Sequence, residues 1–164
     1  MLRTLQRLLF PVLNALGPLL MILAVAQLLP LGIAYRDGEQ VLQEFSTSAL
    51  ISFAIGLFFF FSTKRFKREL EPRDGFLLVT LSWLSAALVG SIPFYLLLPD
   101  VAYERIFFEA VSCLTTTGAT ALTNLSDLPL SLNYWRCLLS WLGGMGIIVL
   151  AVAILPLLGV GGAQ

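Results

Sequence analysis

The segment from Cys113 to Thr120 restricts the fold more than any other, because it sets a run of hydroxyls and one glycine between strongly apolar segments. The residues before it, Tyr103 to Leu114, are typical of a helix, but about a dozen residues rise only about 18 Å. A full span needs about 20 apolar residues. Irregular polar backbone is tolerated at membrane depth only where it is buried in protein or lines a water-filled path. The sequence therefore predicts a re-entrant loop, made of a short helix, a glycine turn and a returning coil.

The composition indicates an integral membrane protein. Of 164 residues, 58% are hydrophobic and only 12% are charged, whereas about 25% are charged in an ordinary soluble domain. The net charge is zero, so no nucleic-acid partner is expected. Histidine is absent, and Cys113 and Cys137 are expected to be small buried side chains rather than metal ligands or a disulfide.

Apolar segments elsewhere in the chain predict an all-α fold with four transmembrane helices and one re-entrant pore helix. The predicted spans are Leu8 to Ala34, Ser46 to Thr63, Phe76 to Leu98 and Tyr134 to Leu155. We expect the first span to bend or break near Pro18 and the third to kink or stop early near Pro93, since proline lacks a backbone N–H.

Polar segments and aromatic residues mark the ends of these spans. The segment from Tyr35 to Phe45 predicts the first loop, and Ala121 to Asn133 predicts a coil after the glycine turn. Tyr134, Trp135 and Trp141 are expected to anchor the last span at the membrane interface.

The distribution of basic residues predicts the orientation. Lys64 to Gly75 contains five basic and three acidic residues, and such a cluster faces the cytoplasm by the positive-inside rule. Arg3 and Arg7 would lie on the same side, so both termini are predicted to be cytoplasmic. We expect an N-terminal helix pair over residues 1–70 and a helix–pore loop–helix repeat over residues 71–164.

The glycine turn has the chemistry of a cation site. A helix that stops inside the membrane directs its carbonyl end, with about half a negative charge, at the membrane interior. The carbonyls and hydroxyls of Thr115 to Thr117 could replace the hydration shell of a monovalent ion, and Gly118 is predicted to have a positive φ. Acidic residues outnumber basic ones around the predicted outer mouth, with Asp100, Glu104, Glu109 and Asp127 against Arg105.

Simpler roles remain open for the same residues. The threonine hydroxyls could bond back to helix carbonyls or pack between spans. For Gly143, Gly144 and Gly146 we favour close helix packing over a ligand role.

Two ionisable residues also allow more than one role. Glu109 could brace the pore helix, which we favour, or act as a charge at the outer mouth. Arg136 is its candidate partner, although it could extend to the membrane interface instead.

Several segments, taken together and in this order, resemble the TrkH branch of the Trk/Ktr/HKT potassium-uptake family. These are FFEAVSCLTTTGAT at residues 107–120, WR at 135–136, WLGGMGIIV at 141–149 and ILPLLGVGG at 154–162. The resemblance covers about Leu77 to Gly162, and the first two spans resemble the extra N-terminal helix pair of that branch.

The resemblance implies a potassium filter built from four pore loops in one polypeptide. Thr116 and Thr117 would supply potassium-coordinating oxygens and Gly118 would be the filter glycine, with Ala119 implying looser selectivity against sodium. It also implies potassium uptake across the bacterial inner membrane by passive or ion-coupled permeation (symport). The implied partners are the remaining repeats, a second copy in a homodimer, and a cytoplasmic ring of nucleotide-binding subunits similar to TrkA.

A single pore loop cannot surround an ion. We therefore expect the chain to be the N-terminal piece of a longer protein, or else four copies to assemble. The alternative is a non-catalytic membrane scaffold without an ion pathway of its own. We do not expect an enzyme, because the sequence has neither histidine nor a GxSxG or HExxH motif, and threonine without a base is a poor nucleophile.

Overall fold

The structure is a computed structural model that describes residues 2–63 and 72–154, with side chains described for residues 10–63 and 75–149. The described residues form α-helices and one short 3-10 helix, without a strand. The predicted cytoplasmic cluster lies largely outside them, as do the side chains of Arg3 and Arg7 and the glycine-rich end of the sequence. The elements are α1 (Leu2–Ala26), α2 (Leu28–Asp37), α3 (Leu42–Thr63), α4 (Pro72–Gly90), α5 (Ile92–Leu97), α6 (Tyr103–Leu114), η2 (Leu125–Asp127) and α7 (Leu130–Ile154).

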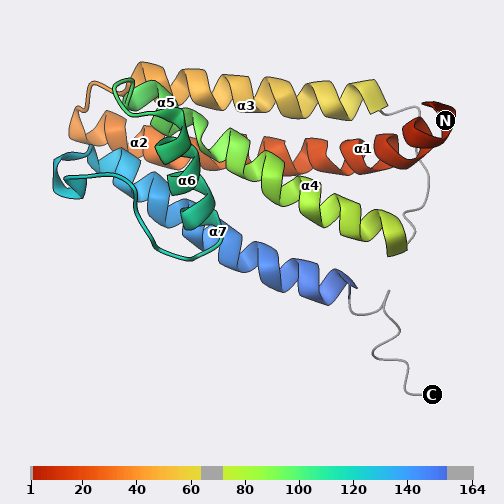
Figure 1. Cartoon of the computed structure of the whole chain (residues 1–164). Helices are drawn as coiled ribbons and strands as arrows, with labels where there is room; N and C mark the ends of the chain where they lie inside the picture. The colour runs from red at the N-terminus through yellow and green to blue at the C-terminus, as the bar shows by residue number, and fades with distance from the viewer. Residues whose placement is uncertain (1, 64–71, 155–164) are drawn as a thin grey trace.

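Long helices run side by side, and the short helix α6 is inserted among them (Figure 1). We call the end of the bundle that carries residues 38–41, 98–102 and 125–129 the loop end (Figure 1). At the opposite end α1 begins, α3 ends, α4 begins and α7 ends (Figure 1). The arrangement confirms the predicted all-α class of membrane protein.

Three segments of the described chain are long and apolar enough to cross a membrane, namely Phe10–Asp37, Leu42–Thr63 and Gly75–Leu97. They correspond to the first three predicted spans. The fourth predicted span overlaps α7, which is 25 residues long; the part of α7 whose side chains the structure describes is less apolar than these three segments.

The predicted break near Pro18 is wrong, because α1 continues through Pro11 and Pro18. The interruption falls instead at Gln27, between α1 and α2. Pro30 explains why the helix is interrupted at Gln27. A proline nitrogen cannot donate to the carbonyl four residues earlier, which here is that of Ala26. The backbone at Gln27 stays helical, with φ −66° and ψ −15°, so the two helices form one interrupted span.

Proline has the expected effect on the third span. Helix α4 ends at Gly90, a turn follows at Ser91, and Pro93 lies in the first turn of α5. The indole N–H of Trp135 donates to the Gly90 carbonyl over 3.0 Å. Neighbouring groups thus satisfy the backbone where the helix is interrupted, as an apolar environment requires.

Two predicted loops are too long. Helix α2 extends to Asp37 and α3 begins at Leu42, so only residues 38–41 join them. Helix α7 begins at Leu130, before the predicted start of the fourth span. Both errors have the same cause: polar residues in the first and last turns of helices that extend beyond the apolar region do not stop those helices.

Close packing of glycines joins α1 to α3. A Cβ atom on Gly17 would lie 2.9 Å from the Gly56 carbonyl oxygen, and one on Gly56 would lie 2.9 Å from that of Gly17. Small residues of this kind let two membrane helices approach closely. The helix pair α1 and α3 also contacts α4 and α5, which in turn support α6.

Candidate functional site

Helix α6 has the bounds predicted from the sequence and ends against the middle of α7. A Cβ atom on Gly143 would lie 1.7 Å from the Leu114 carbonyl oxygen, so the end of α6 rests directly on the glycine. Gly143 is 13 residues after the start of α7, about 20 Å along a helix at 1.5 Å per residue. The turn after α6 therefore lies about half-way along α7, as a re-entrant loop requires.

The predicted role in close helix packing is confirmed for Gly143, but Gly144 and Gly146 show no comparable approach. At Gly144 a Cβ atom would make an ordinary contact, 3.7 Å from Cγ2 of Thr116, and at Gly146 it would meet nothing within 4 Å. Gly143 alone among these three glycines is required by a close backbone approach.

The turn contains two residues with positive φ. Gly118 has a φ of 75°, as predicted, and Thr116 has a φ of 58°, which was not predicted. Such a conformation is uncommon for a β-branched residue and costs of the order of 1 kcal/mol. The backbone N–H groups of Thr117 and Gly118 both donate to the Ser112 carbonyl, over 3.0 and 3.5 Å. These contacts fold the turn back onto the end of α6.

The carbonyl oxygens of Thr116, Thr117 and Gly118 accept no hydrogen bond from any described residue. The carbonyls of Leu114 and Thr115, at the end of α6, likewise accept none. The nearest engaged carbonyls are that of Cys113, which accepts from Thr116 N over 2.9 Å, and that of Ala119, which accepts from Ser112 Oγ over 2.5 Å. Residues 115–120 are all exposed in this chain. The turn thus presents consecutive unpaired carbonyls, from Thr115 to Gly118, in an exposed segment.

The side-chain hydroxyl of Thr115 makes two contacts. Thr115 Oγ1 donates back to the Val111 carbonyl over 2.8 Å, which is the simpler role considered above. It also lies 2.8 Å from Oγ1 of Thr117. The hydroxyl of Thr115 thus stabilises the end of α6.

Glu109 is fully buried and forms the centre of the contacts that hold the loop. Its carboxylate accepts from Arg136 Nε over 2.8 Å and lies 2.6 Å from Arg136 Nη2. The same carboxylate accepts from Thr120 Oγ1 over 2.9 Å and from the Ala121 N–H over 3.1 Å. The bracing role is confirmed, and Glu109 is therefore not a charge at the outer mouth.

Arg105 holds the carbonyl of the same residue, Ala121. Its Nε donates to the Ala121 carbonyl over 3.0 Å, and its Nη2 donates to the same oxygen. Since Arg105 and Glu109 are one helical turn apart, two side chains of α6 bind both the N–H and the carbonyl of Ala121. This clamp, defined by Arg105, Glu109 and Arg136, fixes where the loop leaves the turn.

The coil that follows is joined to α7. Asn133 Nδ2 donates to the Leu125 carbonyl over 2.9 Å, and Arg136 Nη1 donates to Asn133 Oδ1 over 3.3 Å. Trp135, predicted to be an interfacial anchor, is fully buried, which corrects that prediction. Trp141 is 62% exposed, but it lies two residues before Gly143, near the middle of α7, and this position does not support a role as an interfacial anchor.

Glu39 is a residue whose role the sequence analysis missed. It lies in the short connection between α2 and α3, and Oε1 accepts from the Leu130 N–H over 2.7 Å. Its two oxygens also accept from the Ser131 N–H, over 3.4 and 3.3 Å. A carboxylate at a helix N-terminus satisfies unpaired N–H groups and suits the helix dipole. The N-terminal helix pair is thus attached to the helix that supports the pore loop.

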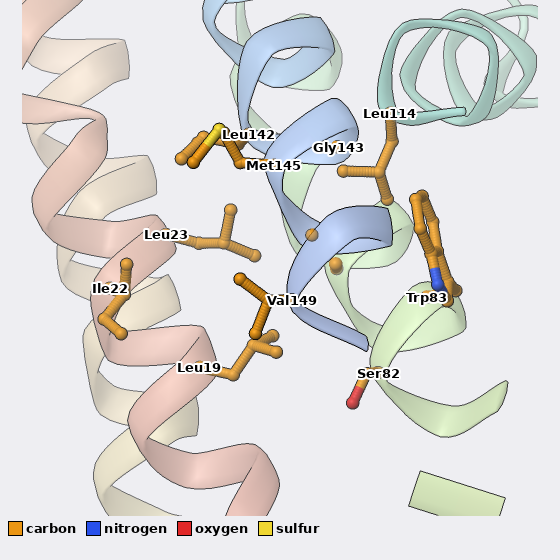
Figure 2. Close-up of a pocket in the computed structure, with 12 residues that line it drawn as sticks. Leu19, Ile22, Leu23, Ser82, Trp83, Leu114, Leu142, Gly143, Met145 and Val149 are labelled. Carbon is orange, nitrogen blue, oxygen red and sulfur yellow. The ribbon is translucent and has the colours of Figure 1, made fainter. Parts of the chain in front are cut away.

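An apolar cavity of about 390 Å³ lies below the end of α6, between α1, α4 and α7. Figure 2 shows Leu114 at its upper edge beside Gly143, with Trp83 on one side and Leu23 on the other. Ser82 provides its one side-chain hydroxyl. The cavity lacks the oxygen ligands that a desolvated cation needs, so the exposed turn is the candidate ion site.

A short helix that stops against the middle of a membrane helix and returns through a turn of unpaired carbonyls defines a membrane protein of the pore-loop class. The sequence profile of the TrkH family, described as a cation transport protein, matches residues 41–164. This match covers most of the chain, which therefore belongs to the TrkH family.

Individual relatives agree with the family match. The Trk system potassium uptake protein TrkH of Vibrio parahaemolyticus is 44% identical over 156 residues, covering 93% of this chain and 32% of that protein. TrkH of Escherichia coli strain K12 is 42% identical over 151 residues, covering 90% and 31%. The crystal structure of the potassium transporter TrkH from Vibrio parahaemolyticus superposes with a TM-score of 0.86 at 40% identity, covering 95% of this chain and 34% of that one. The chain thus spans about a third of the length of these relatives.

Proposed function

We propose that this chain supplies one quarter of a potassium-selective pore, with the carbonyl oxygens of Thr116, Thr117 and Gly118 as its share of the filter. The observation that carries the proposal is that these three consecutive carbonyls accept no hydrogen bond from any described residue and belong to an exposed segment of the turn. Stacked carbonyls of this kind replace the water around a dehydrated monovalent cation. The names of the relatives as potassium uptake proteins support potassium as the transported ion.

Two electrostatic features favour a cation at this turn. The carbonyl end of α6 carries about half a negative charge and lies beside the turn. Asp100, Glu104 and Asp127 are exposed near the loop end, where they would raise the local concentration of cations. Arg105 is the nearby basic residue, and part of its guanidinium is engaged by the Ala121 carbonyl.

The complete pore needs three further loops of the same kind. Relatives about three times as long as this chain are consistent with additional repeats in one polypeptide. We assign residues 1–70 to an N-terminal helix pair and residues 71–164 to the first repeat. By the family resemblance, the assembled protein would be a homodimer in the bacterial inner membrane, with cytoplasmic termini and a TrkA-like cytoplasmic nucleotide-binding partner. Its activity would be passive or ion-coupled permeation without covalent chemistry.

The decisive experiment substitutes two glycines that share a backbone conformation. Gly118 and Gly38 have φ values of 75° and 69°, and a Cβ atom on either would meet nothing within 4 Å. Substitution by alanine therefore imposes a similar strain of about 1 kcal/mol at both positions. Gly118→Ala changes the candidate filter, whereas Gly38→Ala changes the connection between α2 and α3.

Potassium uptake is measured in a transport-deficient host that expresses the complete gene product, with protein levels checked for each variant. We expect Gly118→Ala to abolish most uptake and to lower discrimination against sodium, and Gly38→Ala to retain uptake. Normal uptake and selectivity in Gly118→Ala would refute the filter assignment. Equal losses in both variants would attribute the effect to backbone strain alone.

A further inference from the structure

The interruption between α1 and α2 contains a buried side chain whose polar groups are only partly satisfied. Gln27 is fully buried, and its Nε2 donates to Ser52 Oγ over 3.1 Å. Its Oε1 has no hydrogen-bond partner among the described residues. A buried polar atom without a partner costs about 1 to 3 kcal/mol. This cost is difficult to avoid within a membrane span, because lipid offers no donor.

A second unpartnered group lies on the helix that faces Gln27. Ser48 is fully buried, and its Oγ has no partner among the described residues. Ser48 and Ser52 are four residues apart and lie on the same side of α3, about 6 Å apart along the helix axis. The single hydroxyl proton of Ser52 is already used, because its Oγ donates to the Ser48 carbonyl over 2.7 Å and accepts from Gln27. A group that satisfies Gln27 Oε1 must therefore come from beyond Ser52.

The backbone contributes a third polar group at the interruption. Pro30 has no N–H, so the Ala26 carbonyl lacks the donor that an uninterrupted helix would provide. The interruption thus combines two acceptors, the Ala26 carbonyl and Gln27 Oε1, with one hydroxyl, that of Ser48, which can donate. A water molecule matches this set, since it donates twice and accepts, and buried waters usually make two to four hydrogen bonds.

We propose that one ordered water molecule binds at the interruption between α1 and α2. It donates to Gln27 Oε1 and to the Ala26 carbonyl and accepts from the Ser48 hydroxyl. The water replaces the N–H that Pro30 removes and joins the interrupted span to α3. This inference does not depend on the proposed ion pathway, because none of its residues belongs to the pore loop.

The test is a double-mutant cycle on the complete gene product, purified in detergent and followed by thermal unfolding. Gln27→Met keeps the length of the side chain and removes its polar atoms, and Ser48→Ala removes the hydroxyl. If both residues bind one water, the loss in Tm of the double variant will be clearly smaller than the sum of the single losses. The control cycle pairs Gln27→Met with Thr47→Ala, an exposed neighbour, and should be additive.

A crystallographic map of the same protein that resolves ordered water provides the second readout. We expect solvent density within hydrogen-bond distance of Gln27 Oε1 and Ser48 Oγ, absent in the double variant. Additive losses in the Gln27 and Ser48 cycle, or a map in which Gln27 Oε1 bonds directly to Ser48, would overturn the proposal. A rise in Tm with potassium or sodium over choline that Gln27→Met abolishes would also overturn it, because a cation would then occupy the site.

Discussion

The buried carboxylate of Glu109 stabilises the pore loop through an ion pair and through hydrogen bonds. It joins Arg136 of α7 to Thr120 and Ala121 of the loop. Removing one member of a buried ion pair typically costs about 3 to 5 kcal/mol, because the other charge loses its partner. Arg136 keeps 19% of its side-chain surface exposed, so we expect Glu109→Gln to cost nearer about 3 kcal/mol and to reduce potassium uptake.

The comparison variant for this prediction is Glu104→Gln, an exposed carboxylate on the same helix. Thermal unfolding and uptake are measured for both variants and for the charge exchange Glu109→Arg with Arg136→Glu. Glu104→Gln should stay within about 0.5 kcal/mol of the unmodified protein. Equal stability of all the variants would show that the ion pair does not support the loop.

Thr116 stores strain in the turn, because it is a β-branched residue with a φ of 58°. Glycine adopts this conformation without a Cβ penalty. Thr116→Gly should therefore raise the free energy of unfolding by up to about 1 kcal/mol. The same change loosens the candidate filter, and we expect weaker discrimination of potassium from sodium in competition uptake. A destabilised Thr116→Gly variant would show that contacts of the threonine side chain outweigh its strain.

At the scale of secondary-structure elements, the contact between α6 and α7 sets the depth of the loop. Gly143→Ala would place a Cβ atom 1.7 Å from the Leu114 carbonyl oxygen, so α6 must move. Overpacking of this kind costs about 1 to 3 kcal/mol, and we expect loss of uptake together with a lower Tm. Gly144→Ala is the matched control, since its Cβ atom meets Thr116 Cγ2 at an ordinary 3.7 Å. A Gly143→Ala variant as active as Gly144→Ala would contradict the assigned contact.

Glu39 links the N-terminal helix pair to α7, and this link is testable by itself. Loss of a helix-capping side chain costs about 1 kcal/mol, so Glu39→Ala should lower stability by about that amount. Gln40→Ala, a change at the exposed neighbouring residue, should have no measurable effect. Identical unfolding of the two variants would mean that the carboxylate does not stabilise α7.

Features defined by neighbouring residues could be predicted from the sequence, whereas features defined by residues distant in the chain could not. The bounds of α6 and the positive φ of Gly118 followed from the short helical segment and its glycine, which neighbouring residues define. The place of the first interruption did not, because Pro18 and Pro30 look alike in the sequence and differ only in how their helix turns are packed. The roles of Glu39 and Trp135 depend on α7 and Gly90, which are distant in the chain, so no local pattern could reveal them.

Across the whole molecule, the positive-inside rule predicts which end of the bundle faces outward. A variant with Cys113→Ala and Cys137→Ala provides a background without thiols. In intact cells, a membrane-impermeant maleimide should label Gln40→Cys and Asp100→Cys at the loop end but not Gly75→Cys at the opposite end. Labelling of Gly75→Cys alone would reverse the orientation and direct the pore loop toward the cytoplasm.

The ion pair between α6 and α7 has a consequence for biosynthesis. Glu109 precedes Arg136 in the chain, so a ribosome inserting this protein delivers the acid to the membrane before its counter-ion exists. A carboxylate in lipid without a partner is strongly unfavourable, and α6 is too short to cross the bilayer. We therefore expect α6 to wait at the membrane surface until α7 has been inserted, and only then to enter beside it.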